Sequence, residues 1–118
     1  RRTWSDCHGE VERRFTKDEL LTTMTLYWLT ATIGTSFRSY YERRYHPWQP
    51  VHQRTPVVEA PTAVAVFPGD IIRLPHRWAE RYYNLNRWTV MPQGGHFAPM
   101  EEPDHLVDDV RTFFRQFR

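Results

Sequence analysis

The sequence has a single cysteine, Cys7, among its 118 residues, so no disulfide can form within the chain. A lone cysteine fits a reducing compartment. There is no run of about 18 apolar residues, so we expect no membrane span. The opening residues, RRTWSDCHGE, lack the apolar segment of a secretory signal. These absences make the cytoplasm the expected location. Because the chain opens on Arg1 and not on methionine, we expect a processed or partial chain.

The sequence also lacks a concentrated basic run. Its 16 Lys and Arg residues are nearly balanced by 14 Asp and Glu residues, which argues against a nucleic-acid partner. No P-loop or G-x-G-x-x-G motif is present to cradle a phosphate. We expect neither a metal nor an organic cofactor, because five of the histidines show no ligand spacing with the cysteine and are interpreted as surface residues: His8, His46, His52, His76 and His105.

The first part of the chain has a helical pattern. Thr16 precedes Glu19 by three residues, which is the capping-box spacing at a helix start. Gly34 interrupts the pattern, and Thr35 or Ser36 is expected to cap a second helix that reaches Tyr45. We predict a helical pair, because apolar residues recur at helical spacing at Leu20, Met24, Tyr27, Trp28 and Ala31.

A proline-rich stretch follows, with four prolines between His46 and Thr62. Proline removes backbone donors and biases its predecessor away from helix. We therefore predict a connector at residues 47–61 between a helical region, 1–46, and a second region, 62–118.

The second region alternates strand and helix patterns. Residues 62–67 form a short apolar run typical of a strand buried on both faces, and residues 87–91 are a second strand candidate. Residues 74–83 are predicted to be helical with Pro75 near the first position, and residues 103–118 to form an amphipathic helix. We interpret the acidic run EEPD, residues 101–104, as the N-terminal acid of that last helix. The strand–helix–strand–helix order predicts an α/β fold with a parallel sheet.

Two polar residues follow these predicted strands. Asp70 comes just after the first and His96 just after the second. Neighbouring parallel strands in a right-handed crossover end at the same sheet edge, where ligands of open α/β sheets bind. An Asp beside a His nitrogen fixes the tautomer and makes the His a usable general base. Gly94 and Gly95 allow a tight turn and a close backbone approach. The alternative is that both residues are solvated turn residues.

Three stretches resemble the C-terminal part of microsomal-type epoxide hydrolases, which are α/β-hydrolases. They are DCHGEVERRFTKDELLTTMTLYWLTATIGTSFRSYYE, PTAVAVFPGDI and RWTVMPQGGHFAPMEEPDHLVDDVRTFF. GGHFA and EEP followed by a helix are fairly specific to that family, and the resemblance extends from about Trp4 to Phe117. It implies that residues 1–46 are the end of a helical lid. Residues 62–118 would be the last strands and helices of the hydrolase core.

The resemblance also implies roles. In the family an upstream aspartate attacks the oxirane and forms an alkyl-enzyme ester, and a His–acid pair activates the water that hydrolyses the ester. His96 matches the general base. Asp70 matches its acidic partner, a position where Glu can also serve. Tyr40 matches the lid tyrosine that donates a hydrogen bond to the epoxide oxygen, with Tyr41 as its neighbouring alternative. The implied substrate is a small-molecule epoxide.

The chain departs from the family by having no G-x-D-x-G-like nucleophile elbow, no HGWP-like oxyanion segment and no first lid tyrosine. Covalent catalysis needs nucleophile and base together, so we expect the 118-residue polypeptide alone to be inactive, with the missing part on another chain or lost by truncation. Bare sheet strands should make it poorly stable or prone to associate with itself or the missing part. A dehalogenase, an esterase or a non-catalytic binding module are the alternatives.

Overall fold

The computed structural model describes the whole chain, Arg1–Arg118, and its internal contacts divide it into two compact units. One unit is Thr16–His52. The other combines Arg1–Phe15 with Gln53–Arg118. The first fifteen residues therefore pack with the C-terminal half, although the sequence suggested grouping them with the helices. The boundaries 1–46, 47–61 and 62–118 remain a prediction.

The unit Thr16–His52 is helical, and its first helix begins where the sequence predicts. Helix α1 spans Lys17–Thr30, and the capping box is complete, since the Thr16 side chain accepts from the Glu19 N–H and the Glu19 carboxylate accepts from the Thr16 N–H. It ends at Ala31 in the left-handed conformation. No residue of this unit is buried. Its helices are therefore stabilised within the unit mainly by local hydrogen bonds.

The second predicted helix is two helices. Helix α2 spans Ile33–Ser36, and α3 spans Arg38–Tyr45. The expectation that Thr35 or Ser36 caps the second helix was wrong, because both hydroxyls donate backward to carbonyls of their own turn and α3 has no side-chain cap. Such backward bonds compete with capping geometry in Ser and Thr.

The other unit contains a parallel pair of strands joined by a helical crossover, as predicted. Strand β1 spans Val58–Val66, helix α4 spans His76–Tyr82, and strand β2 spans Tyr83–Val90. Both strands are longer than predicted, and β1 begins inside the stretch assigned to the connector. Pro75 is the N-cap of α4 and not its first residue. No residue of strand β1 is fully buried, so the expectation of burial on both faces was wrong for this chain.

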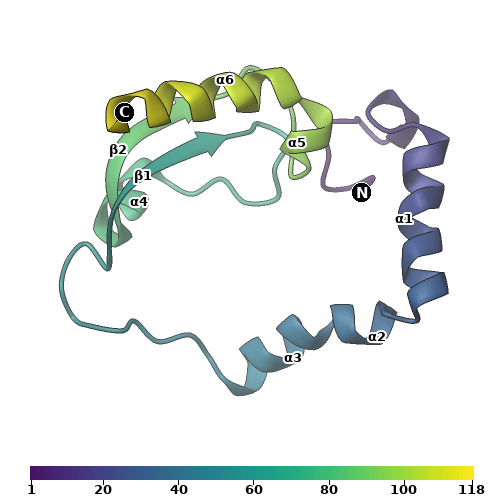
Figure 1. Cartoon of the computed structure of the whole chain (residues 1–118), viewed down its shortest axis with the longest axis horizontal. Coiled ribbons are helices and arrows are strands. Elements are labelled where there is room, and N and C mark those ends of the chain that lie inside the picture. Colours follow the sequence, from purple (N-terminus) through teal and green to yellow (C-terminus); the bar gives the residue numbers. More distant parts are fainter. The chain divides into compact units, whose positions relative to one another are not determined.

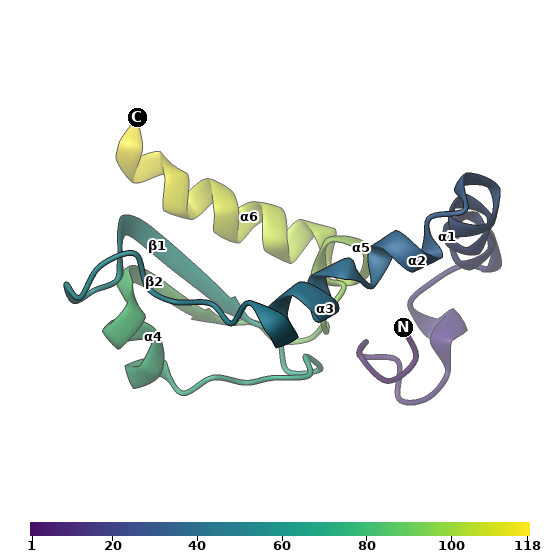
Figure 2. The ribbon, with the colours of Figure 1, turned by 90° about the horizontal axis from the view of Figure 1, so that it is seen from below.

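Helices lie on both sides of the strands (Figure 2). Helix α5 spans Ala98–Glu101, and α6 spans Pro103–Phe114 with Pro103 at its start as predicted, followed by the short 3₁₀ helix η2, Arg115–Phe117. Helix α6 runs along the strands (Figure 1) and is tied to β2, because Asp109 accepts hydrogen bonds from Arg87 at 2.7 Å and from Thr89 at 2.7 Å. No helix combines the length and apolar character that a membrane span requires.

A small core lies where the strands end. Phe67, Met91 and Ala98 are buried together there. The N-terminal segment contributes Cys7 and Phe15, which are fully or almost fully buried; it also contains the 3₁₀ helix η1, Val11–Arg13. The Phe15 ring meets the Phe97 ring edge-on with centroids 5.8 Å apart. The best-packed part of the molecule is thus the part that surrounds the loops after β1 and β2.

Candidate active site

The loops that follow β1 and β2 are held side by side by continued strand pairing. The last paired residues are Val66 and Val90, and one further parallel bridge joins Gly69 to Gly95. The Gly69 N–H donates to the Gly94 carbonyl at 2.8 Å. Because Asp70 and His96 each directly follow a glycine of this bridge, the register alone brings their backbones together.

The side chains of Asp70 and His96 are in contact. His96 Nδ1 lies 3.0 Å from Asp70 Oδ1. The same carboxylate oxygen accepts the Ile71 N–H at 2.6 Å, which fixes the orientation of the carboxylate. With Nδ1 facing an acceptor, the neutral imidazole carries its proton there, and Nε2 is the basic nitrogen. The exposed fractions of the two side chains are 44% and 34%, so water reaches the pair.

Gly94 and Gly95 are required by close packing as well as by the turn. Gly94 has a φ of +97°, and a Cβ there would lie 2.8 Å from Glu102 Cγ and 2.9 Å from the Phe67 ring. A Cβ on Gly95 would lie 2.9 Å from each of three atoms in residues 4–6. Only glycine fits both positions. The sequence predicted a close backbone approach here, but not that the N-terminal segment makes it.

Three acceptors bind the backbone of the segment that carries His96. The His96 N–H donates to the Trp4 carbonyl at 2.8 Å. The Gly94 N–H donates to the Asp6 carboxylate at 3.1 Å, and the Phe97 N–H donates to the Glu101 carboxylate at 3.0 Å. The imidazole also packs edge-on between the Trp4 and Phe97 rings, with centroids 5.3 Å away in both cases.

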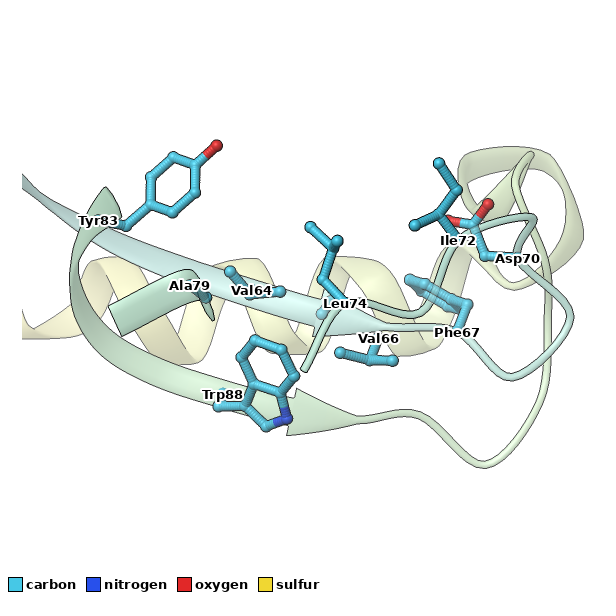
Figure 3. Close-up of a pocket in the computed structure, with 10 residues that line it drawn as sticks. Val64, Val66, Phe67, Asp70, Ile72, Leu74, Ala79, Tyr83 and Trp88 are labelled. Carbon is cyan, nitrogen blue, oxygen red and sulfur yellow. The ribbon is translucent and has the colours of Figure 1, made fainter. Parts of the chain in front are cut away.

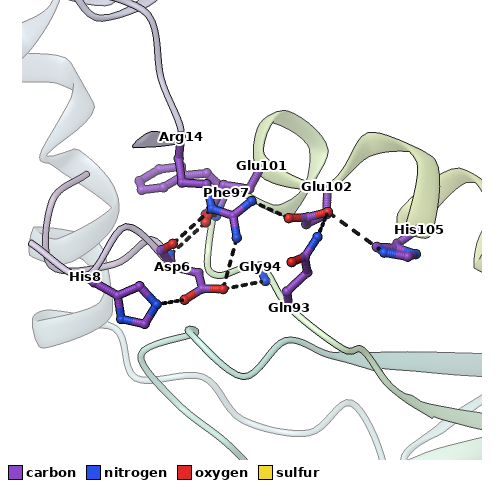
Figure 4. Close-up of polar contacts among 9 residues, drawn as sticks. All are labelled: Asp6, His8, Arg14, Gln93, Gly94, Phe97, Glu101, Glu102 and His105. Atoms are coloured by element: carbon purple, nitrogen blue, oxygen red, sulfur yellow. Dashed lines mark hydrogen bonds and ion pairs between the residues drawn. The ribbon is translucent and has the colours of Figure 1, made fainter. Parts of the chain in front are cut away.

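The acids around this segment form a network with Arg14 (Figure 4). Arg14 pairs with Asp6 at 3.2 Å and with Glu102, and its Nε donates to the Asp6 carbonyl at 2.9 Å. Of the acidic run predicted at the start of the last helix, Glu102 is the N-cap residue of α6 and Asp104 lies in its first turn, whereas Glu101 ends α5. Glu101 and Glu102 are also buried and hydrogen-bonded, which the sequence did not predict. No group of three or more His, Cys, Asp or Glu side chains is placed to hold a metal ion.

The folded chain lowers the pKa of Asp6, a carboxylate of this network. The Gly94 N–H stabilises its charged form and, with a smaller contribution from the Arg14 guanidinium and from His8, lowers the pKa of Asp6 against the opposing effect of burial. Asp6 is therefore charged at neutral pH. No sequence pattern indicated this role, because Gly94, whose N–H has the largest effect on the pKa of Asp6, lies near the other end of the chain.

An apolar pocket of about 250 Å³ lies on one face of the strands beside Asp70 (Figure 3). Asp70 contributes to its wall and His96 does not. The apolar side chains that line it include Val64, Val66, Phe67, Ile72, Leu74 and Trp88. Several of them are substantially exposed, such as Ile72 at 68%.

Tyr40, the predicted lid tyrosine, lies on α3 in the unit Thr16–His52. Its side chain is 65% exposed, and its ring is 6.4 Å from that of Phe37. The neighbouring Tyr41 instead packs against Tyr45, with ring centroids 4.5 Å apart. The two tyrosines therefore contact different rings: Tyr40 contacts Phe37, and Tyr41 contacts Tyr45.

Known proteins match the chain along nearly all of its length. Epoxide hydrolase 1 of Sus scrofa is 40% identical over 106 residues, which are 89% of this chain and 23% of that protein. A putative epoxide hydrolase of Stigmatella aurantiaca is 37% identical over 116 residues, 98% of this chain and 25% of that protein. No family model matches the chain.

The fold gives the same relationship. The crystal structure of juvenile hormone epoxide hydrolase from the silkworm Bombyx mori matches with a TM-score of 0.80 and 30% sequence identity, over 98% of this chain and 31% of that one. The predicted α/β-hydrolase fold class is thereby confirmed. The chain spans about a quarter of the length of the curated relatives it matches. In sequence and in fold, the chain is similar to epoxide hydrolases, which are α/β-hydrolases, and these matches fit a C-terminal fragment of such a protein.

Proposed function

We propose that the protein to which this segment belongs hydrolyses a small-molecule epoxide to a diol, and that His96 and Asp70 activate the water. The observation that carries the proposal is the 3.0 Å contact between His96 Nδ1 and Asp70 Oδ1 at the carboxyl ends of two parallel strands. The similarity to proteins named epoxide hydrolases supports the choice of substrate class.

The reaction has two steps. A carboxylate supplied from outside this chain attacks one oxirane carbon, the carbon–oxygen bond breaks, and the epoxide oxygen takes the proton of the Tyr40 hydroxyl, which leaves a phenolate. This leaves an ester between the alkyl group and the protein. Nε2 of His96 then takes a proton from water, and the resulting hydroxide attacks the ester carbonyl. The diol leaves, the carboxylate is regenerated, and the proton of the imidazolium returns by way of solvent to the Tyr40 phenolate. Asp70 holds the tautomer of His96 and stabilises the imidazolium that forms.

Tyr40 is the proposed donor to the epoxide oxygen in the first step. A phenol hydroxyl that donates a hydrogen bond to developing negative charge acts as an oxyanion-hole group does. This assignment separates an epoxide hydrolase from a dehalogenase, whose halide leaving group needs no proton. An esterase would also use the His96–Asp70 pair, but it would take a serine as the nucleophile.

The 118-residue segment alone is proposed to lack turnover, because its sequence offers no nucleophile elbow. Its exposed apolar side chains, among them Trp28, Val51, Ile72 and Trp78, are expected to promote self-association or binding to the remainder of the hydrolase. Diol formation by the isolated segment would contradict this part of the proposal.

The test uses the longest natural polypeptide that contains these residues. We expect it to convert an aryl or alkyl epoxide to the diol. We expect Tyr40→Phe to slow formation of the ester about 100-fold, the typical effect of losing one oxyanion donor. The matched control is Tyr41→Phe, whose ring packs on Tyr45. Absence of diol formation, or equal effects of the two substitutions, would count against the assignment.

A further inference from the structure

The network around His96 contains a buried carboxylate, Glu101, that the proposed reaction does not use. Its side chain is 7% exposed. One oxygen accepts the Phe97 N–H at 3.0 Å, and the other accepts the Asp6 N–H at 2.8 Å. Figure 4 shows this carboxylate lying between the N-terminal segment and the loop. Both of its oxygens are therefore used by main-chain donors.

Glu101 binds both backbone groups of the residue that follows His96. Its carboxylate accepts the Phe97 N–H, and its own N–H donates to the Phe97 carbonyl at 3.0 Å. The second carboxylate bond reaches Asp6, whose side chain in turn accepts the Gly94 N–H at 3.1 Å. Glu101 thus links Phe97, the residue after His96, to Asp6. Asp6 in turn binds Gly94, which lies two positions before His96.

We propose that Glu101 is a positioning residue for His96, because its carboxylate fixes the backbone of the His96 loop against the N-terminal segment. The inference rests on the proposed function, in which His96 must hold a water against the ester. A shift of about 1 Å in a reacting group is enough to cost up to 100-fold in rate. A group that fixes the backbone beside His96 is therefore coupled to the water-attack step and not to formation of the ester.

Glu101→Gln breaks this arrangement with little change in volume. Both partners of the carboxylate are N–H donors, so a glutamine can accept from only one and must turn its own NH₂ group toward the other. The buried NH₂ group of the glutamine then faces a backbone N–H, and leaving these two donors without an acceptor costs free energy in low-dielectric surroundings. The expected response is a movement of the loop at Phe97 or of the segment at Asp6.

Glu102 supplies a matched control next in the chain. It is 8% exposed and pairs with Arg14, and its Oε2 accepts from the Gln93 amide at 2.8 Å. It accepts no hydrogen bond from the backbone of the His96 segment. In Glu102→Gln the Gln93 amide can rotate and present its oxygen to the new NH₂ group. Both substitutions remove one buried negative charge, but only the change at Glu101 removes a backbone acceptor of the loop.

The experiment follows single turnovers of an epoxide by the longest natural polypeptide with each substitution. Mass spectrometry measures the growth and decay of the alkyl-enzyme, and proton NMR follows the downfield resonance of the His96 Nδ1–H that Asp70 accepts. In Glu101→Gln we expect decay to slow about 10- to 100-fold more than in Glu102→Gln, with growth similar in both. We also expect the Nδ1–H resonance to move or broaden in Glu101→Gln alone.

Equal slowing of decay in the two variants, with an unmoved Nδ1–H resonance, would overturn the positioning role. If no alkyl-enzyme forms in the parent protein, the proposed function fails, and the resonance alone decides the positioning. A resonance that moves only in Glu101→Gln then supports it, and one unmoved in both variants refutes it. Should Glu101→Gln not fold, Glu101→Asp against Glu102→Asp replaces the pair, with a smaller effect expected in the same direction.

Discussion

The loop that carries His96 and the helices of Thr16–His52 are stabilised in different ways. The loop is bound through its main chain by Trp4 and Asp6, which are far away in the sequence, and by the nearby Glu101. In the helical unit the side-chain hydrogen bonds are local: Thr16 pairs with Glu19, and the Thr30 hydroxyl donates to the Leu26 carbonyl. The helical unit has no buried residue, whereas the loop lies against the buried core.

This difference indicates where precision is needed. Helices of the predicted lid can tolerate fraying, but a general base, the role proposed for His96, must stay within hydrogen-bond reach of both its partner and the water. The long-range bonds and the two glycines hold the backbone of His96 in one place. Substitutions in the two regions should therefore have different consequences.

The largest effect of these is expected at Asp70. Asp70→Asn keeps the shape but offers no negative charge to the imidazolium, and it can turn its NH₂ group toward Nδ1. We expect decay of the alkyl-enzyme to slow about 10²- to 10⁴-fold, the usual contribution of acid–base catalysis. Asp70→Glu should retain most of the rate, since a longer carboxylate can serve at this position. Rapid-quench kinetics measures both, and equal losses in the two variants would exclude a charge requirement.

The two glycine sites offer a direct comparison of the regions. Gly95→Ala places a methyl group 2.9 Å from the backbone of residues 4–6, and we expect it to destabilise the fold by about 1–3 kcal/mol. Gly34→Ala in α2 meets nothing within 4 Å and should stabilise the helix by roughly 0.5–1 kcal/mol. Urea unfolding of both variants gives the two free energies. Effects of the same sign would contradict the contrast between the regions.

The smallest expected effect is a change in how the folding stability depends on pH. Because the folded state lowers the pKa of Asp6, its ionisation contributes stability that is fully present above the ordinary aspartate pKa of about 3.9 and is lost as the pH falls from there through the lower folded-state value. Asp6→Asn removes this contribution. Stability measured by thermal unfolding should therefore fall less between neutral and acid pH in the variant than in the parent. An identical pH dependence would show that Asp6 gains nothing from Gly94 and Arg14.

Local patterns were enough to predict much of the fold. The capping box at Thr16 and Glu19, the start of α6 at Pro103 and the parallel strand pair all follow from signals within a few residues. The break at Phe37 was missed because hydroxyls at Thr35 and Ser36 can bond backward as well as cap. The early start of β1 was missed because prolines at positions 56 and 61 argue against a strand.

The site itself was predictable only in part. Topology and the resemblance pointed to Asp70 and His96, and the structure places their side chains in contact, although their catalytic roles remain a prediction. The support around them was not predictable, since Asp6 and Glu101 meet through tertiary contacts that no local pattern encodes. Two adjacent glycines signalled a close approach but could not identify the approaching segment.

The proposed role of His96 as the general base is tested by the fate of the alkyl-enzyme in His96→Gln, with His105→Gln as the control. The longest natural polypeptide containing these residues is mixed with an epoxide, and its mass is followed with time. If His96 activates the water, the variant gains the mass of one epoxide and keeps it, with diol release slowed about 10²- to 10⁴-fold, while the control turns over normally. If His96→Gln releases diol at the parent rate, His96 is not the general base and the account is wrong.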